Sequence, residues 1–140
     1  MKKIIYGLFF GDSITYGEYD GVFGGWVDIL KRYALQNFPE SNNELILFNL
    51  GIGGETSQGC LKRMNHEMNA RNSPEKNVIF LAYGANDLAI KDGKHMVSAE
   101  DFKKNMSEAV ERAQLFSSDI YLINILPFSQ FIDGVESPNG

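Results

Sequence analysis

Hydrophobic residues follow two patterns along this chain: short unbroken runs, and longer segments in which they recur every three or four residues. Unbroken runs are typical of strands in a parallel sheet, because such strands are buried on both faces. The sequence predicts four strands of this kind, at residues 4–10, 45–50, 78–83 and 120–126. The periodic segments between them predict three helices.

Each predicted helix has one apolar face, which we interpret as core packing. The first places these residues on one side and ends before Pro39: Trp26, Ile29, Leu30, Tyr33, Ala34 and Phe38. The second covers roughly residues 57–70, with Met64 and Met68 facing inward beside Cys60 or Leu61. The third follows the capping pattern Ser98-Ala99-Glu100-Asp101 and has an apolar side made of Phe102, Met106, Ala109, Val110 and Ala113.

Strands that alternate with helices indicate an α/β fold with a parallel sheet. We expect a three-layer, flavodoxin-like arrangement with strand order 2-1-3-4 and helices on both faces. Right-handed crossovers then place the first helix on one face and the other two on the opposite face. The pattern stops after the fourth strand, so we expect a single domain over residues 1–140 that is C-terminally incomplete. Half of one sheet face and the fourth-strand edge would be uncovered, which favours self-association into a homo-oligomer.

Composition narrows the possible partners and location. Of 140 residues, 44% are hydrophobic and 22% are charged, as in ordinary globular proteins. Thirteen Lys and Arg against 18 Asp and Glu give a net charge of −5, which disfavours nucleic acid. The only cysteine, Cys60, excludes an internal disulfide and a cysteine zinc site and favours a reducing, cytoplasmic location. No apolar run has the length of a membrane span.

Three polar, glycine-rich segments follow the first three strands: Gly11-Asp12-Ser13-Ile14-Thr15, Asn49-Leu50-Gly51-Ile52-Gly53-Gly54-Glu55-Thr56 and Gly84-Ala85-Asn86-Asp87. Because the carboxyl ends of parallel strands share one edge of the sheet, we expect these segments to meet. Together they supply a hydroxyl, glycine N–H groups and a carboxamide. Those groups suit a serine nucleophile whose developing oxyanion is held by fixed donors, with Ser13, Gly54 and Asn86 in these roles.

The same three segments, in this order, resemble the blocks of the SGNH (GDSL-type) esterase and lipase family. The first block, with Gly24-Gly25-Trp26-Val27 downstream, implies that Ser13 is the nucleophile. The second and third imply that the Gly54 N–H and the Asn86 side chain are oxyanion donors. The resemblance implies a serine ester hydrolase of carboxylesterase, lysophospholipase or acetyl-esterase type. It would act on a small-molecule ester through an acyl-enzyme and need no cofactor.

The chain departs from the family pattern at its C-terminal end, because it stops before the Asp-x-x-His block that supplies the general base. Asp92-Gly93-Lys94-His95 spells this pattern directly after the third block, in a segment predicted to be a polar loop. A solvated loop histidine is the favoured interpretation, with His95 kept as a substitute base. His66 would lie about 15 Å along the second helix and is discarded. The alternative function is a catalytically incomplete fragment or binding module that keeps the pocket without turnover.

Purely structural roles compete with these assignments. Ser13 can satisfy a turn, Asn86 a left-handed conformation, and Gly54 a tight backbone bend. Asp12 and Asp87 are interpreted as supporting carboxylates that accept backbone N–H groups. A pair of carboxylates at one edge could instead hold Mg²⁺, although we expect no metal. A nucleotide-binding function is disfavoured because position 56, where the glycine pattern would continue, is threonine.

Overall fold

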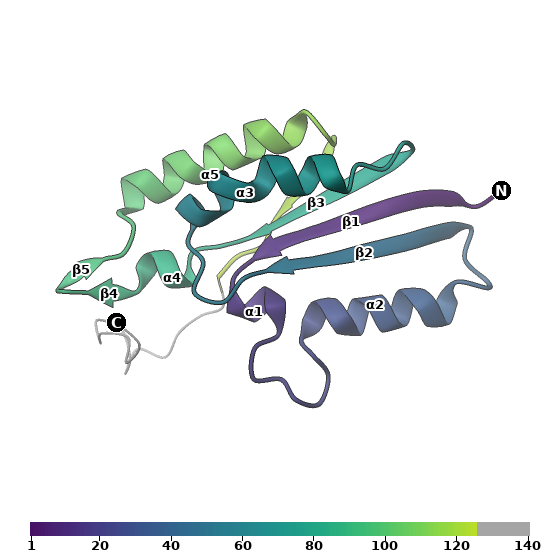
Figure 1. Ribbon diagram of the computed structural model, residues 1–140, viewed down its shortest axis with the longest axis horizontal. Coiled ribbons are helices and arrows are strands. Elements are labelled where there is room, and N and C mark those ends of the chain that lie inside the picture. Colours follow the sequence, from purple (N-terminus) through teal and green to yellow (C-terminus); the bar gives the residue numbers. More distant parts are fainter. Residues whose placement is uncertain (126–140) are drawn as a thin grey trace.

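The computed structural model describes residues 1–125 and has three layers, with a central sheet between helices (Figure 1). Four parallel strands lie in the order β2-β1-β3-β6, which confirms the predicted order 2-1-3-4. Their bounds are Lys3–Gly11 for β1, Asn43–Gly51 for β2, Lys76–Ala82 for β3 and Asp119–Leu122 for β6. The last residue predicted for the fourth strand lies outside the described part. β1 therefore lies at the centre, paired along its whole length with β2.

The three predicted helices are all present. Helix α2 (Trp26–Asn37) lies on one face, whereas α3 (Ser57–Ala70) and α5 (Ala99–Gln114) cover the other (Figure 1). The division between faces confirms the handedness argument. The expected cap of α5 is also present, because Ser98 Oγ accepts a hydrogen bond from the Asp101 N–H at 3.1 Å.

Four short elements were not predicted. Helix α1 (Ser13–Tyr16) follows β1, and helix α4 (Ala85–Leu88) follows β3. An antiparallel hairpin of β4 (Ile90–Lys91) and β5 (Lys94–His95) comes next, so the prediction of a plain polar loop there was wrong. Elements of two to four residues are too short to produce a hydrophobic period, and turn geometry forms them instead.

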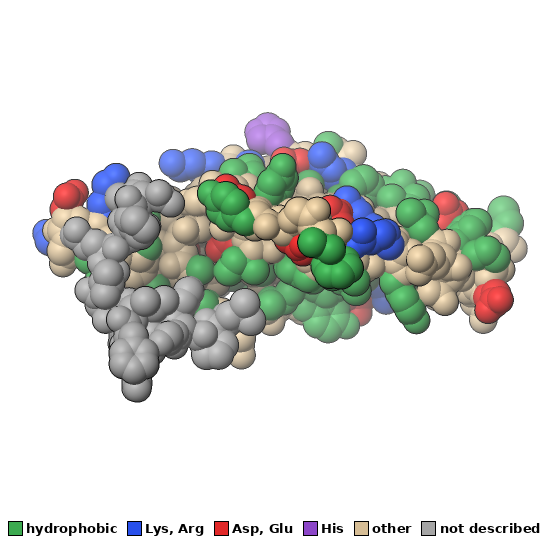
Figure 2. Space-filling model, turned by 90° about the horizontal axis from the view of Figure 1, so that it is seen from below, with side chains coloured by type: hydrophobic (Ala, Val, Ile, Leu, Met, Phe, Trp, Pro, Cys, Tyr) green, Lys and Arg blue, Asp and Glu red, His purple; other side chains and the backbone are tan. Residues whose placement is uncertain are grey.

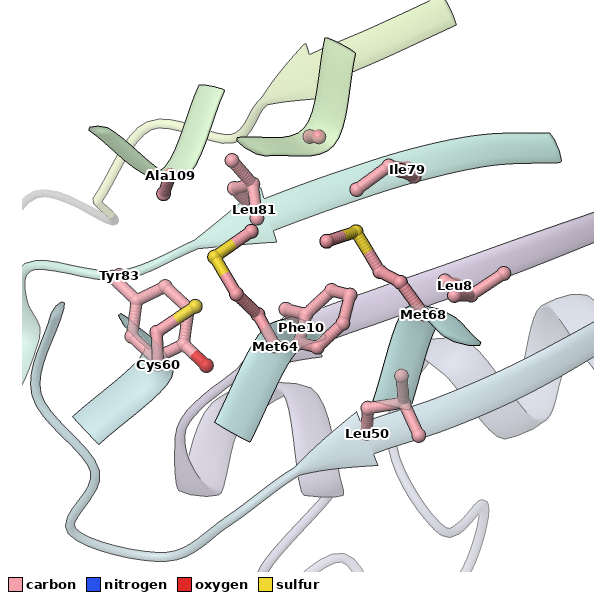
Figure 3. Close-up of a cluster of buried hydrophobic side chains, with 11 residues drawn as sticks. Leu8, Phe10, Leu50, Cys60, Met64, Met68, Ile79, Leu81, Tyr83 and Ala109 are labelled. Carbon is pink, nitrogen blue, oxygen red and sulfur yellow. The ribbon is translucent and has the colours of Figure 1, made fainter. Parts of the chain in front are cut away.

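The main core lies between the sheet and the helix pair α3 and α5 (Figure 3). It is built from side chains that are at most 1% exposed: Leu8, Phe10, Met64, Met68, Ile79, Leu81, Ala109 and Ala113. Cys60 is also fully buried here, while Leu61 packs only partly against the cluster. Burial raises the pKa of the Cys60 thiol to about 11, so it stays protonated and unreactive at neutral pH.

Within residues 1–125 the opposite face is only partly covered, because α2 lies along β2 at one side of the sheet. The predicted burial of the α2 stripe was wrong: Val27 is the buried residue of this helix, while Ile29 is 45% exposed and Tyr33 is 64% exposed. Figure 2 shows this face, with hydrophobic side chains gathered on its surface. One helix cannot enclose a face with room for two.

A row of aromatic rings crosses the sheet on the α2 side. Trp26 meets the edge of Phe9 at 5.4 Å, and Phe9 stacks on Phe80 at 4.3 Å between ring centroids. Phe80 in turn stacks on Tyr121 at 5.2 Å. Stacked and edge-on pairs of this kind stabilise the sheet beyond simple burial. Tyr121, the last ring of the row, lies on β6, the edge strand within residues 1–125, and is 52% exposed to solvent. None of the helices within residues 1–125 has the length and hydrophobicity that crossing a bilayer requires.

Candidate active site

The three predicted loops meet at the carboxyl edge of the sheet. The Ile52 N–H donates to the Gly11 carbonyl at 3.0 Å, which joins the second loop to the first. Asn86 Nδ2 donates to the Glu55 carbonyl at 3.0 Å, which joins the third loop to the second. The expectation that the parallel strands would bring these loops together is confirmed.

Ser13 is the first residue of α1, directly after the end of β1. Asp12 caps this helix by accepting a hydrogen bond from the Ile14 N–H at 2.9 Å. A side chain at Gly51 would come within 2.3 Å of the Tyr16 nitrogen, so glycine there allows α1 to lie against the end of β2. Ser13 is half-buried, and its Oγ forms no hydrogen bond with any residue between 1 and 125.

Gly54 lies in an exposed turn closed by a 3.2 Å hydrogen bond from the Glu55 N–H to the Ile52 carbonyl. Its φ of +72° is in the left-handed region, which glycine adopts without steric cost. A Cβ at this position would have no atom within 4 Å. The backbone of Gly54 is therefore open to an incoming group, and the conformation of the turn is what sets the direction of its N–H.

Asn86 lies in α4 and is half-buried. The hydrogen bond to the Glu55 carbonyl uses one of its two N–H groups. The remaining N–H faces Asp12 Oδ2 at 3.4 Å, which is long for a hydrogen bond and therefore weak. The amide is thus anchored on one side and holds a second donor that another oxygen can take.

Two buried carboxylates support the loops. Asp12 is 3% exposed, and burial raises the pKa of its carboxyl. Asp87 is 1% exposed, and its two oxygens accept from the Ser57 N–H at 3.0 and 3.1 Å, at the start of α3. Ser57 Oγ also donates to Asp87 and accepts from Asn105 Nδ2 at 3.0 Å. Asp87 therefore satisfies a helix N-terminus, which leaves it poorly placed to bind Mg²⁺.

His95 lies in the hairpin beyond α4, and its ring Nδ1 is 2.7 Å from the Leu88 carbonyl. The hairpin projects past α4 at one end of the molecule, whereas α1 with Ser13 lies below the sheet (Figure 1). His95 is exposed, and no hydrogen bond in the described part of the chain joins it to Ser13. His66 is exposed on α3. Neither histidine is brought to the serine by the contacts seen within residues 1–125.

A pocket of about 310 Å³ opens beside the serine loop. Its walls include Ile14 and Thr15 from the first loop, Trp26 from α2 and Ile123 after β6. These walls are mostly apolar. Thr15 Oγ1 is buried without a hydrogen-bond partner in the described structure, which is costly for a hydroxyl.

Comparisons with known proteins decide the family. The model of the GDSL-like Lipase/Acylhydrolase family matches residues 9–139, nearly the whole chain. The chain belongs to the GDSL-like lipase/acylhydrolase family. A search of the curated proteins found no match.

Solved structures share the fold of this GDSL-like protein. AlinE4, an SGNH-hydrolase family esterase, superposes with a TM-score of 0.67 at 21% identity, over 89% of this chain and 60% of AlinE4. TesA gives 0.69 at 23% identity, over 87% of this chain and 62% of TesA. A variant of Axe2, an acetyl xylan esterase from Geobacillus stearothermophilus, gives 0.67 at 23% identity, over 84% and 58% respectively. This chain thus spans only about 58–62% of these neighbours.

One polar cluster of this GDSL-like protein was missed by the sequence analysis. Glu55, Arg63 and Tyr83 form a hydrogen-bonded group directly behind the second and third loops. Their separation along the chain hides the contact. One indication was available, because Arg63 is three residues after the buried Cys60 and so lies near the inward face of its helix.

Proposed function

We propose that this GDSL-like protein is a serine ester hydrolase in which Ser13 is the nucleophile. The observation that supports this most strongly is the convergence of three loops: Ser13, the Gly54 turn and Asn86 share one edge of the sheet, joined through the Asn86 hydrogen bond to Glu55. An apolar pocket adjoins the serine loop. The family match favours the same chemistry.

In the proposed reaction, Ser13 Oγ attacks the ester carbonyl carbon, and negative charge develops on the carbonyl oxygen. The Gly54 N–H, the second N–H of Asn86 and the Ser13 N–H would donate to that oxygen. The Ser13 N–H is available because the first N–H groups of a helix have no partner within it. Removing one such donor typically costs about 2.7–4 kcal/mol of transition-state stabilisation.

A base must take the Ser13 proton, since a serine hydroxyl is a weak nucleophile on its own. The proton passes to the departing alcohol, and an acyl-enzyme remains. Water then attacks the acyl group, its proton returns through the base to Ser13 Oγ, and the carboxylic acid leaves. Ser13 Oγ has no partner among residues 1–125, so we assign the base to a histidine outside these 140 residues, with His95 as the substitute.

The pocket beside Ser13 gives the substrate its expected character. Its apolar walls suit a hydrocarbon group of the ester rather than a charged one. Carboxylic esters, lysophospholipids and acetylated sugars all carry an acyl group that such a wall can bind. We propose this range of small-molecule esters as the substrate class.

The test is hydrolysis of p-nitrophenyl acetate by the chain and by Ser13→Ala and His95→Ala variants. Ser107→Ala, an exposed serine on α5, is the matched control. We expect Ser13→Ala to reduce turnover to the uncatalysed rate while Ser107→Ala leaves it unchanged. A comparable loss in His95→Ala would identify the hairpin histidine as the base.

Turnover that survives in Ser13→Ala would overturn the proposed mechanism. Turnover by the unaltered chain that is no faster than by Ser13→Ala would instead show that these 140 residues do not catalyse alone. That result, combined with ester binding, would favour the alternative of a module that keeps the pocket without turnover.

A further inference from the structure

A buried ion pair lies directly behind the Gly54 turn. Arg63 of α3 donates to Glu55 through Nε at 2.8 Å and through Nη2 at 2.5 Å, so the two planar groups face each other in bidentate geometry. The side chains are 17% and 8% exposed. Bidentate pairs of this kind fix direction as well as distance. The carboxylate of Glu55 is therefore held in one orientation.

Tyr83 adds a third contact to the same carboxylate. This residue follows β3 directly, is 4% exposed, and donates its hydroxyl to Glu55 Oε2 at 2.7 Å. Its ring lies beside Cys60 in the core (Figure 3). Burial raises the pKa of Tyr83, so the hydroxyl remains protonated and continues to donate.

Arg63 also connects the pair to the strands. Its Nη2 donates to the Leu50 carbonyl near the end of β2 at 2.5 Å, and its guanidinium lies 5.5 Å from the centre of the Phe10 ring on β1. Burial acts to lower the pKa of Arg63, but the hydrogen bonds to Glu55 and the electrostatic interactions with neighbouring groups together outweigh it, and the pKa is raised. The cluster therefore ties the ends of β1, β2 and β3 to the turn.

Glu55 connects Arg63 and Tyr83 to the candidate active site. Its side chain is held by Arg63 and Tyr83, while its main-chain carbonyl accepts the hydrogen bond from Asn86 Nδ2 at 3.0 Å. Gly54 precedes it in the chain, in a turn that no side chain contacts at the Cβ position. Glu55 is thus joined to both donors: it follows Gly54 in the chain, and its carbonyl holds the Asn86 amide.

We propose that Arg63 and Tyr83 are positioning residues that act through Glu55 to aim two oxyanion donors, the Gly54 N–H and the Asn86 amide. The inference rests on the proposed function for its catalytic consequence. Its geometric part is that the orientation of the Asn86 amide depends on the Tyr83 hydroxyl. This part can be tested even if the chain shows no turnover.

The first test is structural and uses the Asn86 side-chain amide as a reporter in ¹H–¹⁵N NMR spectra. Its pair of peaks is identified as the pair that Asn86→Ala removes. Tyr83→Phe deletes the hydroxyl and keeps the ring, and we expect it to shift or broaden these peaks. Arg63→Lys should do so more strongly, because lysine cannot make the bidentate contact.

The control is Tyr6→Phe, which removes a hydroxyl from a half-buried tyrosine elsewhere in the sheet. Tyr6 packs edge-on against Phe48, and its hydroxyl has no hydrogen-bond partner within residues 1–125. Tyr6→Phe should leave the Asn86 peaks in place. Unchanged Asn86 peaks in both Tyr83→Phe and Arg63→Lys would overturn the proposal, whatever the activity of the chain.

The second test is kinetic and separates positioning from general stability. We expect Tyr83→Phe to lower kcat by about tenfold with little change in KM. This loss is smaller than the roughly 10²–10³-fold loss expected when a donor is removed, because the donor is still present but less well aimed. In an Asn86→Ala background the same substitution should cost less than about threefold, because one of the two donors that Tyr83 positions is gone. Equal losses in both backgrounds, or a rise in KM alone, would contradict the proposal. Ser13→Ala reports separately on the proposed function.

Discussion

The two faces of the sheet use the same strands but are closed to different degrees. On the α3 and α5 side, Met64 and Met68 fill the space above β1 and β3 and are completely buried. On the α2 side, the aromatic row runs from Phe9, which is 2% exposed, to Tyr121, which is 52% exposed. Within residues 1–125, the face under α3 and α5 is fully packed, whereas solvent exposure on the α2 face increases from β1 towards β6.

The difference shows that the strands carry apolar residues for both faces, although residues 1–125 fully cover only one of them. Alternate residues of a strand point to opposite faces, so Phe10 joins the closed core while Phe9 joins the aromatic row. The closed face should therefore supply most of the folding free energy. The open face should tolerate change and offer contact area.

The largest expected effect is a cavity in the closed face. Met64→Ala should lower the free energy of unfolding by about 2–5 kcal/mol, because a fully buried side chain leaves a void that neighbours fill only partly. Ile29→Ala, on the 45% exposed stripe of α2, is the matched control and should cost less than about 1.5 kcal/mol. Urea unfolding monitored by circular dichroism measures both. Equal costs would show that the two faces do not differ in this way.

A smaller loss is expected in the middle of the aromatic row. Phe80→Ala removes a half-buried ring that stacks on both Phe9 and Tyr121, and should cost about 2 kcal/mol through lost area and two ring contacts. Phe80→Leu restores much of the area and should recover about half of the loss. Denaturant midpoints distinguish the two variants. A Phe80→Ala cost as large as that of Met64→Ala would mean that the open face is as tightly packed as the closed one.

Thr15 allows a change in the opposite direction. Thr15→Val replaces a buried hydroxyl that has no partner in the described structure with a methyl group, and should raise the free energy of unfolding by up to about 1 kcal/mol. Thr56→Val, at a half-buried threonine, should bring no such gain. Thermal unfolding of the two variants provides the comparison. A destabilised Thr15→Val protein would show that the hydroxyl has a partner after all.

Tyr121 tests whether the open face is used for self-association. Tyr121→Ser should change the free energy of unfolding by less than about 1 kcal/mol, since half of the side chain is already in solvent. If the chain associates through this face or the β6 edge, as we predict, the substitution should shift its sedimentation profile towards the monomer. A chain that is monomeric at high concentration before any substitution would contradict the prediction.

The smallest effect concerns pH and the Asp12 carboxyl, whose pKa is raised above the model-peptide value of 3.8 by burial. The folded state then binds the proton more tightly than the unfolded state, so this group's contribution is full below the unfolded pKa. It is lost as the pH rises through the folded pKa. Relative to Asp12→Asn, the unaltered protein should lose stability across this window. An unfolding series from about pH 3 to pH 7 would show a constant difference if the pKa were not raised.

Much of the fold followed from the sequence because it depends on local patterns and general rules. Unbroken apolar runs located the strands, and a capping pattern located the start of α5. The common flavodoxin-like arrangement gave the strand order, and crossover handedness gave the face on which each helix lies. The burial of the apolar stripe on α2 was predicted wrongly because it does not follow from a local pattern. Its burial depends on what covers the face, which no pattern within the helix records.

The site was predictable only in outline. The loops that carry Ser13, Gly54 and Asn86 could be placed together because parallel strands deliver their ends to one edge. The contacts that orient them could not, since Tyr83 reaches Glu55 across 28 positions and Asn86 reaches it across 31. Such pairs become neighbours only when the strands find their places in the sheet.

The central position of β1 has a consequence for how the site forms. β1 is made first, yet one partner begins at Asn43 and the other at Lys76, so the sheet closes only after long stretches of chain have been brought back. Pairings of this kind carry a high loop-closure entropy and are slow. Before β3 docks, the serine loop and the asparagine loop exist as separate segments without a shared edge. The proposed active site therefore forms only after β3 has paired with β1.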